Sequence, residues 1–165
     1  GNCTYLDKNF LLVDIPGTYS LISHSKEEEV ATEFISSNIS DVTVVVVDAT
    51  CLERNLNLVY QIMNITNNVI ICVNLLDEAK KKGIKIDLAL MSHLLGVPVV
   101  GTTARCKKTL VNLMKTVYNV CTGSIICTPK KIDFPKNISE EDSIIYDDVY
   151  LKQIRYFIIL GGFCI

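Results

Sequence analysis

Short apolar runs alternate with amphipathic segments along most of this chain. Four runs are rich in Val, Ile and Leu and cover residues 9–13, 42–47, 69–73 and 97–100. The second and third runs are apolar almost throughout, which is typical of strands that are covered on both faces. Because helical patterns separate the runs, the sequence predicts a doubly wound α/β fold with a mostly parallel sheet and right-handed crossovers.

The segments between these runs place apolar residues on one face at helical spacing. Residues 25–37 open with the capping-box pattern Ser-x-x-Glu, and residues 51–67 and 109–120 carry similar stripes. Asp87 is suited to cap a further short helix, which Gly96 would end. These stripes predict helices that pack against the sheet.

The composition changes beyond residue 122. Residues 129–136 are rich in Pro and Lys, which is typical of a linker, and a last helical pattern covers residues 150–160. We therefore predict one α/β domain over residues 1–122, followed at 123–165 by a linker and the start of a helical region.

The composition also limits the possible functions. The chain has 165 residues, 49% of them hydrophobic and 21% charged, with a formal net charge of −2. This composition is globular, and the charge gives no general attraction to nucleic acid or anionic lipid. The apolar stretches are shorter than the ~20 residues that span a bilayer, so this segment is expected to be soluble. Seven cysteines without a C-x-x-C pair favour a reduced, cytosolic compartment over a disulfide scaffold.

Polar residues follow each apolar run. Asp14, Asp48, Asn74 and the pair Thr102-Thr103 would meet at the carboxyl edge of a parallel sheet, where such folds bind ligands. Asp48 can equally cap the helix that follows it, and by itself this alternative is favoured. Taken together, the polar ends predict a polar crevice beside an apolar sheet.

Asp14-Ile15-Pro16-Gly17 has the D-x-x-G pattern of a nucleotide-sensing turn. A carboxylate at a strand end can hold a Mg²⁺-bound water, and a glycine lets its backbone N–H approach a γ-phosphate closely. The alternative is an ordinary strand-to-helix turn with an Asp cap. No G-x-x-x-x-G-K-[ST] phosphate loop occurs anywhere in the sequence.

Asn74-Leu75-Leu76-Asp77 is a candidate guanine-binding segment. The carboxylate of Asp77 can accept two parallel N–H bonds from guanine, a pair that adenine does not offer, while Asn74 would hold the base and the neighbouring loops. The alternative is a strand end followed by Asp77 as a helix cap. Thr103-Ala104-Arg105 would support the base, since a small residue there lets a backbone N–H meet the guanine O6.

Other reactive side chains give weaker signals. His24 and His93 are isolated, and Cys106, which precedes two lysines, is best explained as an incidental thiol. No Cys/His cluster has the spacing of an iron or zinc site, so the sequence does not support direct iron binding by this segment.

These motifs resemble the GTP-binding domain of the bacterial ferrous iron transporter, the FeoB family. Residues 13–21 are similar to the family signature D-[LI]-P-G-T-Y-S-L, and residues 48–56 match another of its typical stretches. Asn74-Leu75-Leu76-Asp77 has the apolar second residue that this family tolerates where other GTPases have lysine. Residues 96–100, before the base loop, also fit, and the likeness covers roughly residues 7–120.

The resemblance implies a Ras-like GTPase fold that binds GTP or GDP together with Mg²⁺. Asp14 would coordinate Mg²⁺ through water, Gly17 would sense the γ-phosphate, and Asn74 and Asp77 would recognise guanine. The implied partners are the guanine nucleotide and the helical and transmembrane regions of a parent transporter, with this domain on the cytoplasmic side of the bacterial inner membrane. GTP binding and hydrolysis would be coupled to Fe²⁺ uptake.

The sequence departs from the family pattern on the phosphate side of the site. The phosphate loop, the first switch with its Mg²⁺-binding threonine, and the first strand and helix of the fold have no match in it. We therefore expect weak or no GTP binding and no useful GTPase rate. The alternative is a non-hydrolysing fragment or degenerate regulator that acts by protein contact. A soluble GTPase of the ribosome- or tRNA-related kind is a third option, but such proteins more often keep N-K-x-D and carry a basic appended domain.

Overall fold

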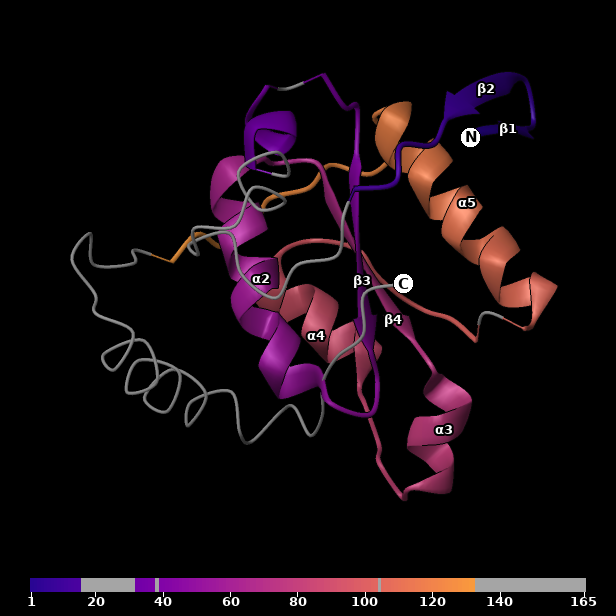
Figure 1. Ribbon diagram of the computed structural model, residues 1–165, viewed down its shortest axis with the longest axis vertical. Coiled ribbons are helices and arrows are strands. Elements are labelled where there is room, and N and C mark those ends of the chain that lie inside the picture. The colour runs from indigo at the N-terminus through magenta and orange to yellow at the C-terminus, as the bar shows by residue number, and fades with distance from the viewer. Residues whose placement is uncertain (16–31, 38, 104, 133–165) are drawn as a thin grey trace.

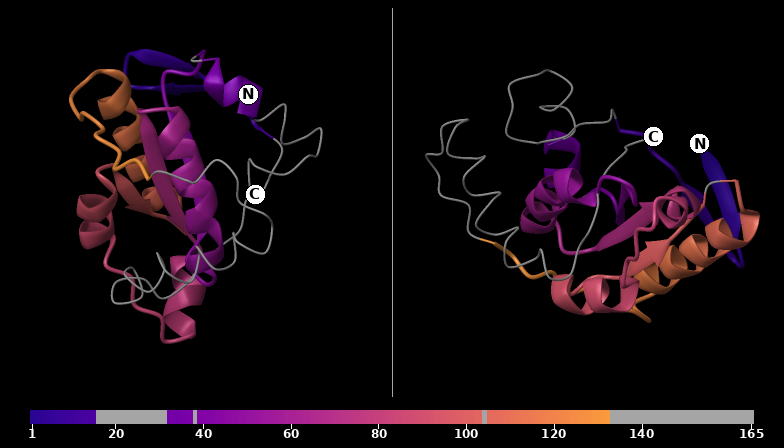
Figure 2. Two further views of the ribbon diagram at one scale, coloured as in Figure 1. Left: turned by 90° about the vertical axis from the view of Figure 1, so that its left-hand side faces the viewer. Right: turned by 90° about the horizontal axis from the view of Figure 1, so that it is seen from below.

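The computed structural model of the chain describes residues 1–15, 32–37, 39–103 and 105–132 (Figure 1). A parallel sheet with helices on both sides lies at its centre, so the predicted α/β fold is confirmed. Figure 2 shows the same layers from the side and from below.

The sheet contains β3 (Thr43–Asp48), β4 (Val69–Asn74) and β5 (Val99–Gly101), in that order. Both pairings are parallel, with Asp48 opposite Asn74 and Val73 opposite Gly101. The predicted runs therefore became strands, although the third begins later than its apolar run. Because the strands share one direction, their carboxyl ends lie at the same edge of the sheet, at the lower end of the view in Figure 1.

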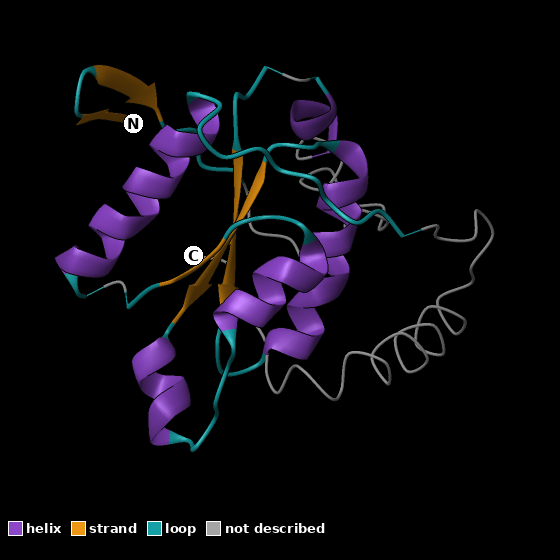
Figure 3. Ribbon diagram, turned by 180° about the vertical axis from the view of Figure 1, so that it is seen from behind, coloured by secondary structure: helices purple, strands orange, loops and turns teal. Residues whose placement is uncertain are grey.

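Helices cover both faces of this sheet. α2 (Leu52–Ile65) and α4 (Leu88–Leu95) lie on one side, whereas α5 (Lys107–Cys121) lies on the other (Figure 1, Figure 3). The short helix α3 (Leu76–Lys81) extends from the carboxyl end of β4. The sequence pattern predicted α2, α4 and α5, whereas α3 entered only as the alternative in which Asp77 caps a helix; Lys80 and Lys81 occupy its last turn.

The core is centred on β4, all of whose residues are buried. Covering by helices on two sides explains why this strand is apolar on both faces, as its sequence predicted. Large fully buried side chains of the core come from α2 and β4: Leu52, Leu56, Met63, Ile70 and Ile71. Burying one such side chain stabilises the fold by about 1.5–3 kcal/mol relative to leaving it exposed.

The predicted caps of α4 are confirmed. Asp87 Oδ1 accepts a hydrogen bond from the Leu90 N–H at 2.9 Å, and Gly96 ends the helix with φ 72°. A β-carbon at Gly96 would lie 2.1 Å from the carbonyl oxygen of Thr128. Glycine is therefore required here both by the left-handed backbone and by the close approach of residue 128.

The first predicted strand needs correction. A strand was expected over 9–13 within the parallel sheet, but β2 (Lys8–Leu11) forms a separate antiparallel hairpin with β1 (Asn2–Tyr5). At the open end of the hairpin, where β1 begins and β2 ends, Gly1 and Leu12 exchange two hydrogen bonds of 2.6 Å. Pairing with β1, which the apolar pattern did not reveal, determined the position of this strand.

Two predicted helices lie partly or wholly outside the residues that the structure describes. Within the predicted helix over 25–37, residues 32–36 are helical and the rest of its first turns lie outside the described part. The predicted helix over 150–160 lies wholly outside it. The six cysteines that are described are all free thiols. No helix in the described ranges is both long and apolar enough to cross a membrane.

Candidate functional site

Three of the predicted polar strand ends meet at the carboxyl edge of the sheet. Asp48, Asn74 and Thr102 follow or end β3, β4 and β5, and they are 3%, 5% and 1% exposed. Polar side chains buried to this degree require hydrogen-bond partners. Their partners connect the three strand ends to one another.

Asp48 stabilises the turn after β3 and does not cap α2. Its carboxylate accepts a hydrogen bond from the Thr50 N–H, while the Ala49 N–H donates to the carbonyl oxygen of Asn74 at 2.8 Å. The residue at the cap position of α2 is Cys51, which makes no side-chain cap bond. The capping alternative for Asp48 was therefore wrong, because the chain makes an extra turn before the helix begins.

Asn74 is held from the neighbouring strand. The Thr102 hydroxyl donates to Asn74 Oδ1 at 3.1 Å, and the Thr102 N–H donates to the Val73 carbonyl at 2.8 Å. The Leu76 N–H in turn donates to the Thr102 carbonyl at 3.3 Å. Side chain and backbone of one threonine thus bind the segment 74–77 to the end of β5.

The turn between Asn74 and Asp77 has an unusual backbone. Leu75 has φ 60° and ψ 31°, a left-handed conformation that a residue with a branched side chain rarely adopts. This turn starts α3 and places Asp77 in its first turn. Leu76 then packs against β5, where a β-carbon added to Gly101 would lie 2.3 Å from Leu76 Cδ1. The strained turn and the close packing together fix the position of Asp77.

One carboxylate oxygen of Asp77 is buried without a hydrogen-bond donor among the described residues. This oxygen, Oδ1, is shielded from solvent and receives no hydrogen bond from the part of the chain that the structure describes. A buried carboxylate oxygen without a donor costs free energy, on the order of 1–3 kcal/mol or more for a charged group. Asp77 does not act as the cap residue of α3, which is Leu75. The capping alternative is therefore wrong here too, and Oδ1 is left without a donor from the described residues.

The loop after β5 is closed by a residue that the sequence analysis did not select. The Thr103 N–H donates to Thr109 Oγ1 at 3.1 Å, and this hydroxyl lies 2.8 Å from the Cys106 carbonyl oxygen. Arg105 is exposed, and Ala104 lies outside the described residues. A threonine in the first turn of a helix gives no distinctive sequence signal, because Thr also occurs there as an ordinary surface residue.

The structure does not bring Asp14 to this edge. Asp14 and Ile15 line a groove of about 710 Å³ together with residues 42–46, in the amino-terminal part of β3, and none of Asp48, Asn74 and Thr103 is among its lining residues. In Figure 1 the segment after β2 likewise reaches β3 far from the carboxyl edge. Pro16 and Gly17 lie outside the described residues.

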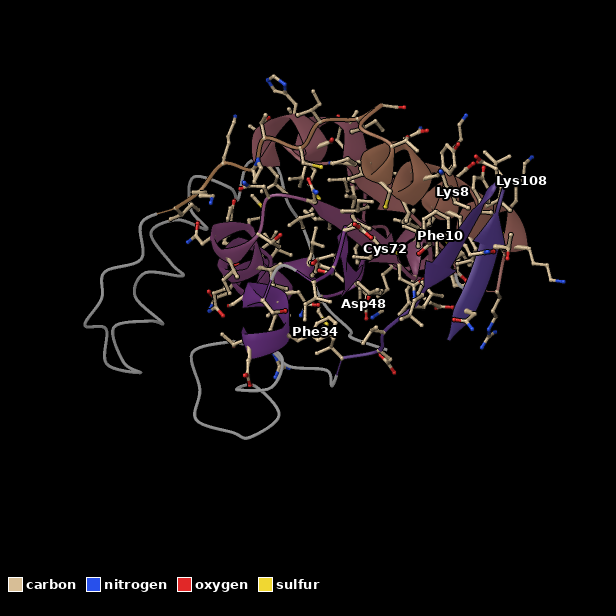
Figure 4. All side chains as sticks on the ribbon, turned by 90° about the horizontal axis from the view of Figure 1, so that it is seen from above. Lys8, Phe10, Phe34, Asp48, Cys72 and Lys108 are labelled. Carbon is tan, nitrogen blue, oxygen red and sulfur yellow. The ribbon has the colours of Figure 1, made fainter. Side chains whose placement is uncertain are left out.

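The groove is mainly apolar and lies between the hairpin and β3. Phe10 of β2 and Phe34 of the 32–36 stretch line it from different sides, and Figure 4 shows them well apart when the molecule is seen from above. Leu58 of α2 and Val117 of α5 complete its walls. Asp14 is itself exposed, and its coordination of Mg²⁺ through water stays a prediction. No step is therefore assigned to a metal.

Comparison with known proteins decides the family. The sequence profile described as "Ferrous iron transport protein B" matches residues 1–117, which are more than half of the chain. The chain belongs to this family. Among members of the ferrous iron transport protein B family, the Fe(2+) transporter FeoB of Campylobacter jejuni is 38% identical over 113 residues. The match covers 68% of this chain and 18% of that relative, so the chain spans less than a fifth of its length.

Solved structures of the family have the same fold. The FeoB G domain from Methanococcus jannaschii is 37% identical, with a TM-score of 0.68, and the match covers 74% of this chain and 76% of that one. The cytosolic domain of the T. maritima FeoB iron transporter in its GMPPNP form is 28% identical, with a TM-score of 0.73. That match covers 92% of this chain and 59% of the other. The predicted G-domain fold and the family resemblance are therefore confirmed.

Proposed function

We propose that this chain contributes the base-reading half of a guanine-nucleotide site in the G domain of a ferrous iron transporter. The observation that carries the proposal is the buried Oδ1 of Asp77, which has no donor among the described residues. Guanine presents two adjacent N–H donors on one edge, and a carboxylate accepts both in parallel. Adenine presents a donor beside an acceptor, so one carboxylate oxygen would remain unpaired.

The neighbouring residues would orient the base. Asn74, held by Thr102, would fix the loop on which Asp77 stands. Thr103, Ala104 and Arg105 would cover the base from the next loop, with Thr109 keeping that loop closed. Leu75 and Leu76 would contribute through the turn and its packing against Gly101. Family membership supports this arrangement, since T. maritima FeoB has been solved in GDP and GMPPNP forms.

We assign no residue of this chain to binding of the nucleotide phosphates. The sequence contains no G-x-x-x-x-G-K-[ST] loop, and Asp14 lies in the groove and not at the carboxyl edge. Each missing charge-assisted hydrogen bond forgoes about 1.5–3 kcal/mol, and ~1.4 kcal/mol corresponds to a tenfold change in affinity. We therefore propose weak binding that depends on the base, with no GTPase turnover by this chain.

The cellular role would follow from the parent protein. The curated relatives are named as Fe(2+) transporters, and this chain corresponds to a small part of them. We propose that nucleotide binding by such a domain regulates Fe²⁺ uptake, with Fe²⁺ as the cargo of the transporter. In that role the domain would lie on the cytoplasmic side of the membrane and contact helical and transmembrane regions.

Exchange of the base-reading group tests the proposal. Ligand-observed NMR at millimolar nucleotide would compare GDP with xanthosine diphosphate, which carries a carbonyl oxygen where guanine has its amino group. The wild-type chain should prefer GDP by about tenfold, and Asp77→Asn should reverse the preference, because the new amide can donate to that oxygen. Glu78→Gln is the matched control, since Glu78 is the next acid of the same helix and pairs with Lys81 at 2.7 Å.

Two results would contradict the proposed function. The first is a wild-type chain that binds GDP and xanthosine diphosphate equally. The second is a preference that Asp77→Asn leaves unchanged. Glu78→Gln should behave like the wild type, and a similar reversal in it would show that net charge and not base recognition determines the preference.

A further inference from the structure

Three buried polar side chains form a continuous chain beneath the proposed base-reading segment. The Thr102 hydroxyl donates to Asn74 Oδ1 at 3.1 Å, and Cys72 Sγ lies 3.2 Å from the same hydroxyl. All three residues are buried, with Thr102 only 1% exposed, so water does not compete for these bonds. Buried polar groups in such a chain polarise one another and fix one another's orientation.

The direction of both hydrogen bonds follows from the number of protons. A hydroxyl has one proton, and Thr102 gives it to Asn74. Toward Cys72 the Thr102 oxygen can then only accept, so the Cys72 thiol must be the donor. Burial raises the pKa of the Cys72 thiol, which keeps it protonated at neutral pH. The series of hydrogen bonds therefore runs from the Cys72 thiol to the Thr102 hydroxyl and on to the Asn74 amide oxygen.

The backbone holds Thr102 in place independently of its hydroxyl. The Thr102 N–H donates to the Val73 carbonyl at 2.8 Å, and the Thr102 carbonyl accepts from the Leu76 N–H at 3.3 Å. The hydroxyl is therefore not needed to attach β5 to β4. What it determines is which end of the Asn74 amide faces β5, because only the oxygen end can accept its proton.

We propose that Cys72 and Thr102 are positioning residues for the nucleotide site, and that they act by fixing the orientation of the Asn74 amide. The thiol donates to the Thr102 oxygen and so commits the Thr102 proton to Asn74 Oδ1. The amide nitrogen of Asn74 is thereby directed away from the Thr102 hydroxyl. This inference rests on the proposed guanine site for its functional consequence, but its structural content concerns the chain without nucleotide.

NMR on the nucleotide-free 165-residue chain tests the structural content. The side-chain amide signals of Asn74, assigned from its own backbone, would be compared in the wild type, Thr102→Val and Thr102→Ser. Valine keeps the shape of threonine without the hydroxyl, whereas serine keeps the hydroxyl. Thr102→Val should shift both signals and speed their exchange with solvent by about tenfold or more, and Thr102→Ser should restore the wild-type signals. Unchanged Asn74 signals in Thr102→Val would overturn the proposal.

The thiol is tested separately, and this second arm decides the matter if Thr102→Val fails to fold. Cys72→Ala removes the donor, so the Thr102 proton is free to turn and the Asn74 signals should broaden. Cys72→Ser restores a donor and should recover sharp signals. Identical Asn74 signals in the wild type and Cys72→Ala would remove Cys72 from the proposal.

A nucleotide titration separates this inference from the proposed function. Thr102→Val should weaken GDP binding by about tenfold in the wild-type background and by less than twofold when Asn74→Ala is also present, because the effect passes through Asn74. Equal losses in both backgrounds would contradict a positioning role. If the wild-type chain shows no preference for guanine, the proposed function fails, while the nucleotide-free NMR result still decides whether the two residues orient Asn74.

Discussion

The backbone N–H of Leu76 donates to the carbonyl oxygen of Thr102 across the end of the sheet, at 3.3 Å. This bond joins the first residue of α3 to the residue that follows β5. The side chain of Leu76 also occupies the position that a β-carbon on Gly101 would need. The segment 74–77 and the end of β5 are therefore in contact through both backbone and side chain. The segment 74–77 and the loop after β5 are therefore joined as one unit, and a change in either should affect the other.

Thr109 offers a direct test of this unit. Thr109→Val removes the hydroxyl that accepts from the Thr103 N–H, so that N–H loses its partner and the loop after β5 opens. Amide exchange at Thr103 should speed up by about fivefold or more, and GDP binding should weaken by a comparable factor. Hydrogen exchange followed by NMR measures the first effect. Thr109→Ser keeps the hydroxyl and should remain close to wild type, whereas equal exchange in both variants would count against this role of Thr109.

Two glycines with the same backbone conformation should respond differently to alanine. Gly83 and Gly96 have φ 74° and 72°, but a β-carbon at Gly83 meets nothing within 4 Å, whereas at Gly96 it would lie 2.1 Å from the Thr128 carbonyl oxygen. Gly83→Ala should cost only the strain of the left-handed backbone, about 1 kcal/mol. Gly96→Ala should cost about 3 kcal/mol or more, because residue 128 must also move. Urea unfolding of both variants measures the difference, and equal losses would contradict the close contact.

Much of the fold was predictable because its core elements carry strong local patterns. β4 is apolar along its length since helices cover both faces, and Asp87 and Gly96 mark the ends of α4 by their own chemistry. The hairpin was not predictable, because β1 contains the polar residues Asn2 and Thr4 and is held to β2 by backbone pairing and by a polar contact, in which the Thr4 hydroxyl donates to Asn9 Oδ1 at 2.8 Å. Its pairing displaced the first predicted strand from the parallel sheet.

The candidate site was predictable in part for a similar reason. Asn74 and Asp77 follow a strand whose position the sequence determines well, so their place at the carboxyl edge followed from the fold. Asp14 follows a strand whose partner the sequence did not reveal, and the structure places it in the groove. Thr102 acts through a hydrogen bond to Asn74, which is distant in the sequence, so no local pattern indicates it. Thr109 bonds to nearby residues, but a threonine at this position gives no distinctive signal.

Replacing one residue of the hairpin turn, Leu6, should increase the stability of the hairpin. Leu6 is 70% exposed and has φ 52°, and it is the first central residue of the two-residue turn between Tyr5 and Lys8. Turns with a positive φ only at this position favour glycine there. Leu6→Gly should therefore stabilise the hairpin by about 1 kcal/mol, with little loss of buried surface. Slower amide exchange across the Cys3–Phe10 pair would verify this, and Leu6→Ala, which keeps the unfavourable backbone, should give no such gain.

The buried Tyr60 should make the free energy of unfolding depend on pH in the alkaline range. Burial in α2 raises the pKa of Tyr60 from 10.0 to about 12. Between these two values the unfolded chain releases the phenolic proton and the folded chain retains it, so the free energy of unfolding falls as the pH rises. Tyr60→Phe removes this contribution, and its unfolding midpoint in urea should decline less steeply between pH 10 and 12 than that of the wild type. Parallel declines in the two proteins would mean that the Tyr60 hydroxyl is hydrated in the folded state.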